Sequence, residues 1–130
     1  DDIIVDLWHK WVLITTVAGA TTLFNATIGE IASTEHGIAF ITDLHSECVT
    51  IAKSEKIKVN DDDLAQQRRF LSDKKSTWSS SMRRDMVNKS KIECAHIFLE
   101  LINIADKNNV ECPSLKTVMI NGEIYMRSLV

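Results

Sequence analysis

The chain has 130 residues, of which 45% are hydrophobic and 25% are charged, and its net charge is −3 at pH 7. This length predicts one domain with its own core, and the mild acidity argues against nucleic acid or an acidic membrane as partner. The three cysteines lack C-x-x-C spacing and the four histidines form no H-x-x-x-H pair. We therefore expect no disulfide framework and no metal site, in a protein of the reducing cytoplasm.

A long helix is predicted first, over residues 6–24, because its apolar side chains recur at helical spacing. Only the run Ile3-Ile4-Val5 before it is typical of a strand. Gly19, inside the helix, is expected to mark the close approach of another backbone. The apolar stretch 11–24 contains four threonines and is shorter than the roughly 20 residues that span a bilayer, so we interpret it as buried.

The remainder of the chain is also predicted to be helical, with polar connections. The sequence has no G-x-G-x-x-G fingerprint and no P-loop, so it offers no usual cradle for a dinucleotide pyrophosphate. An all-α, multi-helix fold in a single domain over residues 1–130 is therefore expected. The predicted elements are a turn over 25–29, a helix capped by Ser33 or Thr34 that ends near 55–56, a connector over 57–60, a helix over 61–71, a loop over 72–81 that is polar apart from Trp78, a helix over 82–107, and a last helix that begins at Pro113.

The stretch from residue 79 to residue 105 carries the most information. The serines at 79–81 can cap a helix, because a hydroxyl accepts from the free N–H groups of the first turn. Apolar residues over 95–105 point all round the axis, which predicts a helix buried on most sides. Glu93 stands at the head of that run without a basic partner one turn further on, and a carboxylate in a core needs a partner. Glu93 is thus either a solvated helix end or a functional group.

Three separated motifs occur along the chain: Leu7-Trp8-His9-Lys10, Ile28-Gly29-Glu30-Ile31, and Ser80-Ser81-Met82-x-x-Asp85 with Ile92-Glu93 further on. Together they resemble, over nearly the whole chain, the C-terminal domain of ketopantoate reductases (2-dehydropantoate 2-reductases). The resemblance implies an all-helical domain like those of that family and of 6-phosphogluconate dehydrogenase. It also implies that the family's N-terminal Rossmann domain, which mainly binds NADP(H), is absent from these 130 residues.

The activity implied by this resemblance is the NADPH-dependent reduction of a 2-oxo acid, such as 2-dehydropantoate in pantothenate biosynthesis, to the 2-hydroxy acid. The isolated C-terminal domain would be inactive without the Rossmann domain of the same polypeptide. The implied partners are a small-molecule 2-oxo acid and that Rossmann domain, and a homodimer is among the assemblies that the resemblance allows.

The resemblance also implies roles for individual residues. From periodicity alone, Lys10 is a lysine whose stem covers apolar surface while its ammonium reaches water. In the family pattern it matches the general acid, which protonates the ketone oxygen as hydride arrives at the carbon. Glu93 matches the glutamate that hydrogen-bonds the substrate, orients the site and contacts the cofactor. Ser81 matches the serine that binds the substrate carboxylate, with a plain N-cap as the alternative. Asp85 matches the family aspartate of the substrate-binding set, as a structural orienter rather than a reactant, and Glu47 matches a structural glutamate.

Three positions depart from the family pattern. One and two turns beyond the lysine the family usually has asparagines, where this chain has Ile14 and Ala18, and Ile28 replaces an asparagine before the glycine of the second motif. The pocket is therefore expected to be apolar. This indicates either a divergent paralogue that reduces another 2-oxo acid, or a non-catalytic helical module kept for dimerisation or another interaction. Three polar side chains are candidate substitutes for the amides: Thr15, Thr22 and Asn25.

Overall fold

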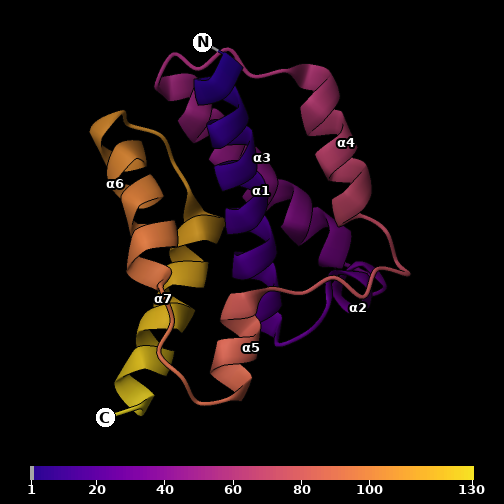
Figure 1. Ribbon diagram of the computed structural model, residues 1–130, viewed down its shortest axis with the longest axis vertical. Helices are drawn as coiled ribbons and strands as arrows, with labels where there is room; N and C mark the ends of the chain where they lie inside the picture. The colour runs from indigo at the N-terminus through magenta and orange to yellow at the C-terminus, as the bar shows by residue number, and fades with distance from the viewer. Residues whose placement is uncertain (1) are drawn as a thin grey trace.

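Helix α1 (Asp2–Phe24) lies at the centre of the computed structural model, which describes residues 2–130 (Figure 1). Helices α6 and α7 lie on one side of it, and α4 and α2 on the other. The described residues contain helices and no strand, which confirms the predicted all-α fold. The further elements are α2 (Ile28–Ala32), α3 (Gly37–Ser54), α4 (Asp61–Leu71), α5 (Ser81–Val87), the π-helical segment η1 (Ala95–Leu99), α6 (Glu100–Lys107) and α7 (Pro113–Ser128).

The middle of α1, residues 15–22, is completely buried by the surrounding helices. Its threonines tolerate this burial because their hydroxyls donate to the carbonyl one turn earlier, as Thr21 does to Val17 at 2.7 Å. By length and composition α1 could also cross a bilayer, but this burial matches our interpretation of a core helix. At Gly19 the close neighbours are side chains rather than a backbone, because an added Cβ would lie 3.1 Å from Leu44 Cδ2.

The first half of the chain differs from the prediction at three helix starts. The run Ile3-Ile4-Val5 belongs to α1, and the expected turn 25–29 contains the start of α2. A capping box opens α2, since the Thr27 hydroxyl accepts from the N–H of Glu30 and the Glu30 carboxylate accepts from the N–H of Thr27. Ser33 and Thr34 do not cap α3, because their hydroxyls donate to carbonyls of α2.

The prediction of a single helix over 82–107 is wrong, because the first helix of this stretch, α5, ends at Val87. Lys89 adopts a left-handed conformation with a φ of 60°. The N–H of Ser90 then donates to the carbonyl of Asp85 at 2.8 Å, and the N–H of Lys89 to that of Met86 at 3.1 Å. This pair of bonds is a Schellman motif, which ends a helix without needing a particular side chain. The same left-handed conformation follows three other helices, at Asn25, Lys56 and Asn109.

The segment after the break, η1 and α6, buries one face instead of its whole circumference. Phe98 and Leu101 are fully buried, whereas Leu99 remains 38% exposed. The buried side chains pack with those of α3 and α7 in the larger of two core clusters. The prediction of a helix buried on most sides is therefore wrong, and an amphipathic helix replaces it.

Helix α7 begins at Pro113, as predicted, and its start is held by a side chain from α3. The carboxylate of Glu47 accepts from the N–H of Ser114 at 3.0 Å and from that of Leu115 at 2.9 Å. A negative charge at a helix N-terminus is favourable, and a hydrogen bond to a charged group contributes about 1.5–3 kcal/mol. The structure thus gives Glu47 the structural role that we expected.

Candidate functional site

The loop before α5 lies directly against the first turn of α2. The N–H of Ile28 donates to the carbonyl of Trp78 at 2.9 Å, and the N–H of Gly29 donates to that of Ser76 at 3.0 Å. A Cβ on Gly29 would lie 2.2 Å from the Ser76 carbonyl oxygen, so only glycine allows this approach. The glycine of the second motif therefore positions the serines that follow Trp78.

Two further contacts fasten the start of α5 to the end of α1. The hydroxyls of Thr21 and Ser80 are 2.7 Å apart, and the Arg83 Nε donates to the Asn25 side chain at 3.1 Å. Ser80 is also the N-cap of α5, since its hydroxyl accepts from the N–H of Arg83. The alternative in which Ser81 is a plain N-cap is therefore wrong. Ser81 is the first helical residue, and its side chain is exposed.

A pocket of about 230 Å³ opens between α1, this loop and η1. Its walls are apolar, and its polar atoms come from the three serines. Ile14, Ala18 and Ser81 meet here, whereas Ile28 does not reach it and is fully buried in the smaller core cluster. The lining residues are Ile14, Val17, Ala18, Trp78, Ser79, Ser80, Ser81, Met82 and Ile97.

Sequence reasoning missed the part that Trp78 plays in this pocket. It was the large apolar residue in an otherwise polar loop, and that contrast is the signal that could have identified it. The indole is half-buried and packs against the smaller core cluster, with its ring 5.1 Å from that of Phe70. Arg83 was missed as well, because a contact to Asn25 across 58 positions leaves no local pattern.

Lys10 lies on α1, which forms one wall of the pocket, and Glu93 lies shortly before η1; neither residue lines the pocket. Lys10 is exposed and sits one turn before Ile14 on the same face of α1. Glu93 lies four residues before Ile97, its side chain is 76% exposed, and it pairs with His96 at 3.6 Å. In this arrangement Glu93 is solvated, which agrees with the first of the two alternatives for this residue.

Asp85 is half-buried in α5 and anchors the end of that helix through its main chain. Its carbonyl accepts from the hydroxyl of Tyr125 at 3.3 Å as well as from the N–H of Ser90. These bonds tie α5 to α7 behind the pocket. These are main-chain contacts, so the role of the Asp85 carboxylate stays a prediction.

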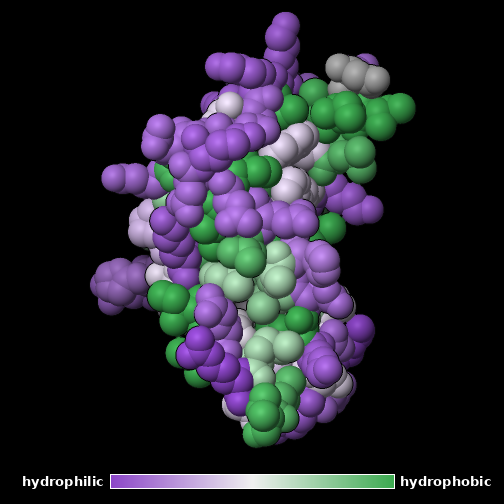
Figure 2. Space-filling model, turned by 90° about the vertical axis from the view of Figure 1, so that its left-hand side faces the viewer, coloured by the Kyte–Doolittle hydropathy of each residue, from purple (hydrophilic) through white to green (hydrophobic). Residues whose placement is uncertain are grey.

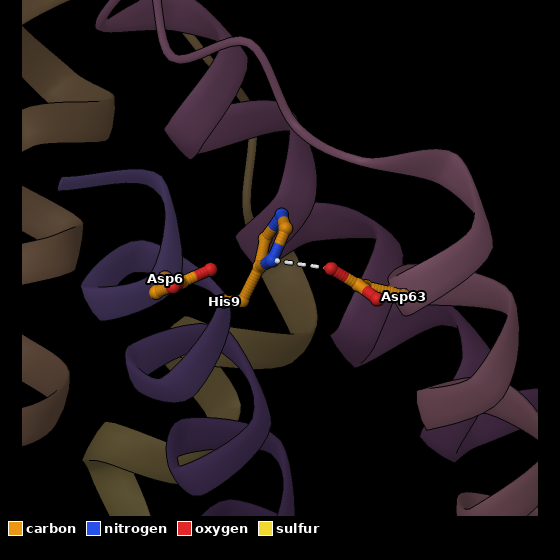
Figure 3. Close-up of side chains that lie close together, drawn as sticks. All are labelled: Asp6, His9 and Asp63. Atoms are coloured by element: carbon orange, nitrogen blue, oxygen red, sulfur yellow. Dashed lines mark ion pairs between the residues drawn. The ribbon is translucent and has the colours of Figure 1, made fainter. Parts of the chain in front are cut away.

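A second cluster of ionisable side chains lies on the other flank of α1. Asp6 and His9 project from α1 and Asp63 from α4, with His9 Nδ1 3.5 Å from the Asp63 carboxylate (Figure 3). The other ring nitrogen, Nε2, accepts from the N–H of Asn60 at 3.1 Å. A neutral imidazole has one lone pair, so Nδ1 must carry the proton and offers no electron pair to a metal. In this arrangement the cluster joins α1 to α4 through the contact between His9 and Asp63.

The same interface contains a buried histidine on α3. His45 is fully buried, and its Nε2 lies 2.8 Å from the Gln67 carbonyl oxygen, while Gln67 donates to the carbonyl of His9. Its Nδ1 is buried and has no hydrogen-bond partner among residues 2–130. Burial therefore lowers the pKa of His45 below the ordinary value of 6.5, and the folded chain favours the neutral ring.

We expect acid to destabilise the fold through His45. Between pH 6.5 and the lower pKa of the folded chain, the unfolded chain binds a proton that the folded chain does not, so the free energy of unfolding falls by up to about 1.4 kcal/mol for each unit by which the pH is lowered. His45→Gln keeps a donor for Gln67 but cannot titrate, so its unfolding free energy should depend less on pH. Urea unfolding of both proteins between pH 7 and pH 5 tests this, and equal slopes would contradict it.

The comparisons with known proteins agree with the fold and the motifs. The family described as "Ketopantoate reductase PanE/ApbA C terminal" matches residues 2–121. The uncharacterized oxidoreductase YkpB of Bacillus subtilis (strain 168) is 32% identical over 120 residues, which cover 92% of this chain and 40% of that protein. The chain thus spans less than half the length of this relative.

Solved structures share the fold at lower identity. The dimeric ketopantoate reductase of Staphylococcus aureus superposes with a TM-score of 0.86 at 17% identity, covering 98% of this chain and 45% of that one. A D-mandelate dehydrogenase in complex with NADH and anilino(oxo)acetate superposes with a TM-score of 0.83 at 19% identity. The match covers 99% of this chain and 43% of that one. At 17% and 19% identity these structures show a shared fold alone. The family match over residues 2–121 rests on the sequence and therefore shows the family. This chain therefore belongs to the family of ketopantoate reductase C-terminal domains.

Proposed function

We propose that these residues form the substrate side of a reductase that converts a 2-oxo acid to the 2-hydroxy acid, together with an N-terminal nucleotide-binding domain of the same polypeptide. One observation carries the proposal: the pocket that holds Ser81 lies beside the α1 face that carries Lys10. The oxidoreductase YkpB, 32% identical, supports the reaction class. The cytoplasm, where substrate and reduced cofactor are available, is the proposed location.

Each proposed role follows from the chemistry of one side chain. The Ser81 hydroxyl donates to the substrate carboxylate, and Asp85 holds α5 so that this hydroxyl faces the pocket. The Lys10 ammonium stabilises the charge that develops on the ketone oxygen and gives it a proton. Glu93 orients the substrate and the cofactor edge beside it. When bound, the reduced nicotinamide supplies the hydride.

The cofactor is proposed to be NADP(H), held mainly by the N-terminal domain. The chain itself has no glycine-rich turn for a pyrophosphate. The D-mandelate dehydrogenase neighbour was solved with NADH, so both nucleotides belong in the experiment.

The test uses the complete polypeptide that contains this domain, with NADPH or NADH deuterated at the reactive carbon of the nicotinamide. We expect the 2-hydroxy acid product to carry deuterium at C2, as seen by mass spectrometry, and NADPH to be the better donor. The 130-residue chain alone should give no product. Absence of labelled product from the complete protein, over a panel of 2-oxo acids with both nucleotides, would contradict the proposal.

The alternative is a non-catalytic module for dimerisation or another interaction. Apolar surface gathers at the upper right of the view in Figure 2. In the first turns of α1, Ile3, Ile4 and Leu7 are 68%, 47% and 58% exposed. Under this alternative the complete protein would produce no labelled acid. Sedimentation analysis would then show self-association that Leu7→Asn weakens.

A further inference from the structure

We propose that the pocket between α1 and the loop before α5 selects 2-oxo acids whose side chain is apolar, and discriminates against a hydroxyl on that side chain. The inference rests on the proposed function and specifies its substrate class. It predicts that 2-dehydropantoate, which carries a hydroxyl on C4, is a poorer ligand than the same molecule without that hydroxyl.

The first argument is the chemistry of the walls. Ile14, Val17 and Ala18 form the α1 side of the pocket, and Met82 and Ile97 face them together with the Trp78 indole. Val17, Ala18 and Met82 are each less than 5% exposed. None of these six side chains has an oxygen, the indole N–H is a donor, and the Met82 thioether is only a weak acceptor. A hydroxyl placed between them therefore loses its water and finds no strong acceptor in return.

The second argument is that two of the three serine hydroxyls are already engaged. Ser80 is bonded to the Thr21 hydroxyl and to the N–H of Arg83, and Ser79 accepts from the Arg83 guanidinium at 3.3 Å. Ser81 is the one serine of the three without a hydrogen bond to another described residue. The Ser81 hydroxyl is therefore free of protein contacts and Ser79 keeps its own O–H as a donor, and a carboxylate uses such donors more effectively than a neutral alcohol does.

The third argument is size. The pocket volume of about 230 Å³ equals the share of roughly eight water molecules at about 30 Å³ each. This matches a compact acid such as 3,3-dimethyl-2-oxobutanoate, which has nine non-hydrogen atoms. That acid is 2-dehydropantoate with the C4 hydroxyl replaced by hydrogen, so the two molecules form a matched pair that differs by one polar group.

The experiment is calorimetric titration of the complete polypeptide, saturated with NADP⁺, with each acid of the pair. An unpaired buried hydroxyl costs about 1–3 kcal/mol, which corresponds to a dissociation constant about 5- to 150-fold lower for 3,3-dimethyl-2-oxobutanoate. The ratio of kcat/KM with NADPH should favour the same acid. Equal binding, preferred binding of 2-dehydropantoate, or no binding of either acid would overturn the inference.

Variants locate the effect within the pocket. Ile14→Asn adds an amide at a position that is already 40% exposed, so the fold should tolerate it, and Ala18→Asn adds a second amide at a buried position. Each change should shift the binding ratio toward 2-dehydropantoate, and the Ile14→Asn result alone suffices if Ala18→Asn fails to fold. Ile124→Asn, on exposed α7 surface outside the pocket, is the control and should leave the ratio unchanged. An unchanged ratio in Ile14→Asn would overturn the inference.

Failure of this inference and failure of the proposed function give different results. If 3,3-dimethyl-2-oxobutanoate binds more tightly than 2-dehydropantoate but no 2-hydroxy acid forms with either nucleotide, the proposed ligand class stands and the reductase proposal fails. If turnover occurs and 2-dehydropantoate is the better substrate, the reductase proposal stands and the ligand class fails.

Discussion

Gly29→Ala should lower the free energy of unfolding by about 3 kcal/mol, the upper end of what overpacking usually costs. The added Cβ would meet main-chain atoms on the loop before α5, at 2.2 Å from Ser76 O and 2.9 Å from Lys74 O. A main chain fixed by hydrogen bonds to α2 cannot rotate away as a side chain can. Urea unfolding followed by tryptophan fluorescence measures the change, and Trp78 reports the displaced loop directly.

Gly122→Ala is the matched control, because it adds the same methyl group to a buried glycine within α7. Its Cβ would meet the Cys94 side chain at 3.2 Å, and no main-chain atom is among its near neighbours. Alanine also favours a helix by up to about 1 kcal/mol over glycine, so the net change should be small. If Gly29→Ala proved no more destabilising than Gly122→Ala, the loop would not be held against α2 as described.

If the complete polypeptide is the reductase that we propose, Lys10→Ala in it should reduce kcat by roughly 10²- to 10⁴-fold and change KM much less. A general acid acts mainly on the charge that develops in the transition state, so its removal affects the chemical step more than substrate binding. Steady-state kinetics with the preferred 2-oxo acid and NADPH measure both constants. A primary isotope effect with deuterated NADPH establishes that the hydride step limits the rate.

Two further lysine variants test whether Lys10 acts by donating a proton or only by its positive charge. Lys10→Arg keeps a cation but has a pKa too high to donate a proton readily, so it should recover little of kcat. Lys53→Ala removes an exposed lysine from the last turn of α3 and should behave like the unmodified protein. A rise in KM with an unchanged kcat for Lys10→Ala would show that this lysine only binds substrate.

The starts of two helices, α4 and α7, could be predicted from side chains in the sequence. Helix α4 follows a polar cap, Asn60, and carries acids in its first turn. Helix α7 begins at its proline. The break at Lys89 could not be predicted, because main-chain hydrogen bonds close that helix end and a lysine takes the position where glycine is the usual signal.

Part of the candidate site could also be predicted from the sequence, because local motifs carry it. The motifs identified Lys10, Ser81, Asp85 and Glu93, and their roles stay predictions. Ile14 and Ala18 share one pocket with Ser81 because α1 contacts α5. Local periodicity in the sequence does not predict that contact. Ile28 illustrates the limit, since an isoleucine at a helix start can face either a pocket or a core, and here it faces the core.

The burial of every thiol makes this domain suitable for chemical replacement of Lys10. Cys48, Cys94 and Cys112 are all unpaired and buried, and burial raises their pKa values, that of Cys48 to about 12. Because the thiolate is the reactive form, alkylating agents should spare all three in the folded domain. A cysteine introduced at the exposed position 10 would be the one readily modified thiol among these residues. Treating Lys10→Cys with 2-bromoethylamine would then rebuild an ammonium group on a thioether stem, nearly isosteric with lysine and with a slightly lower pKa.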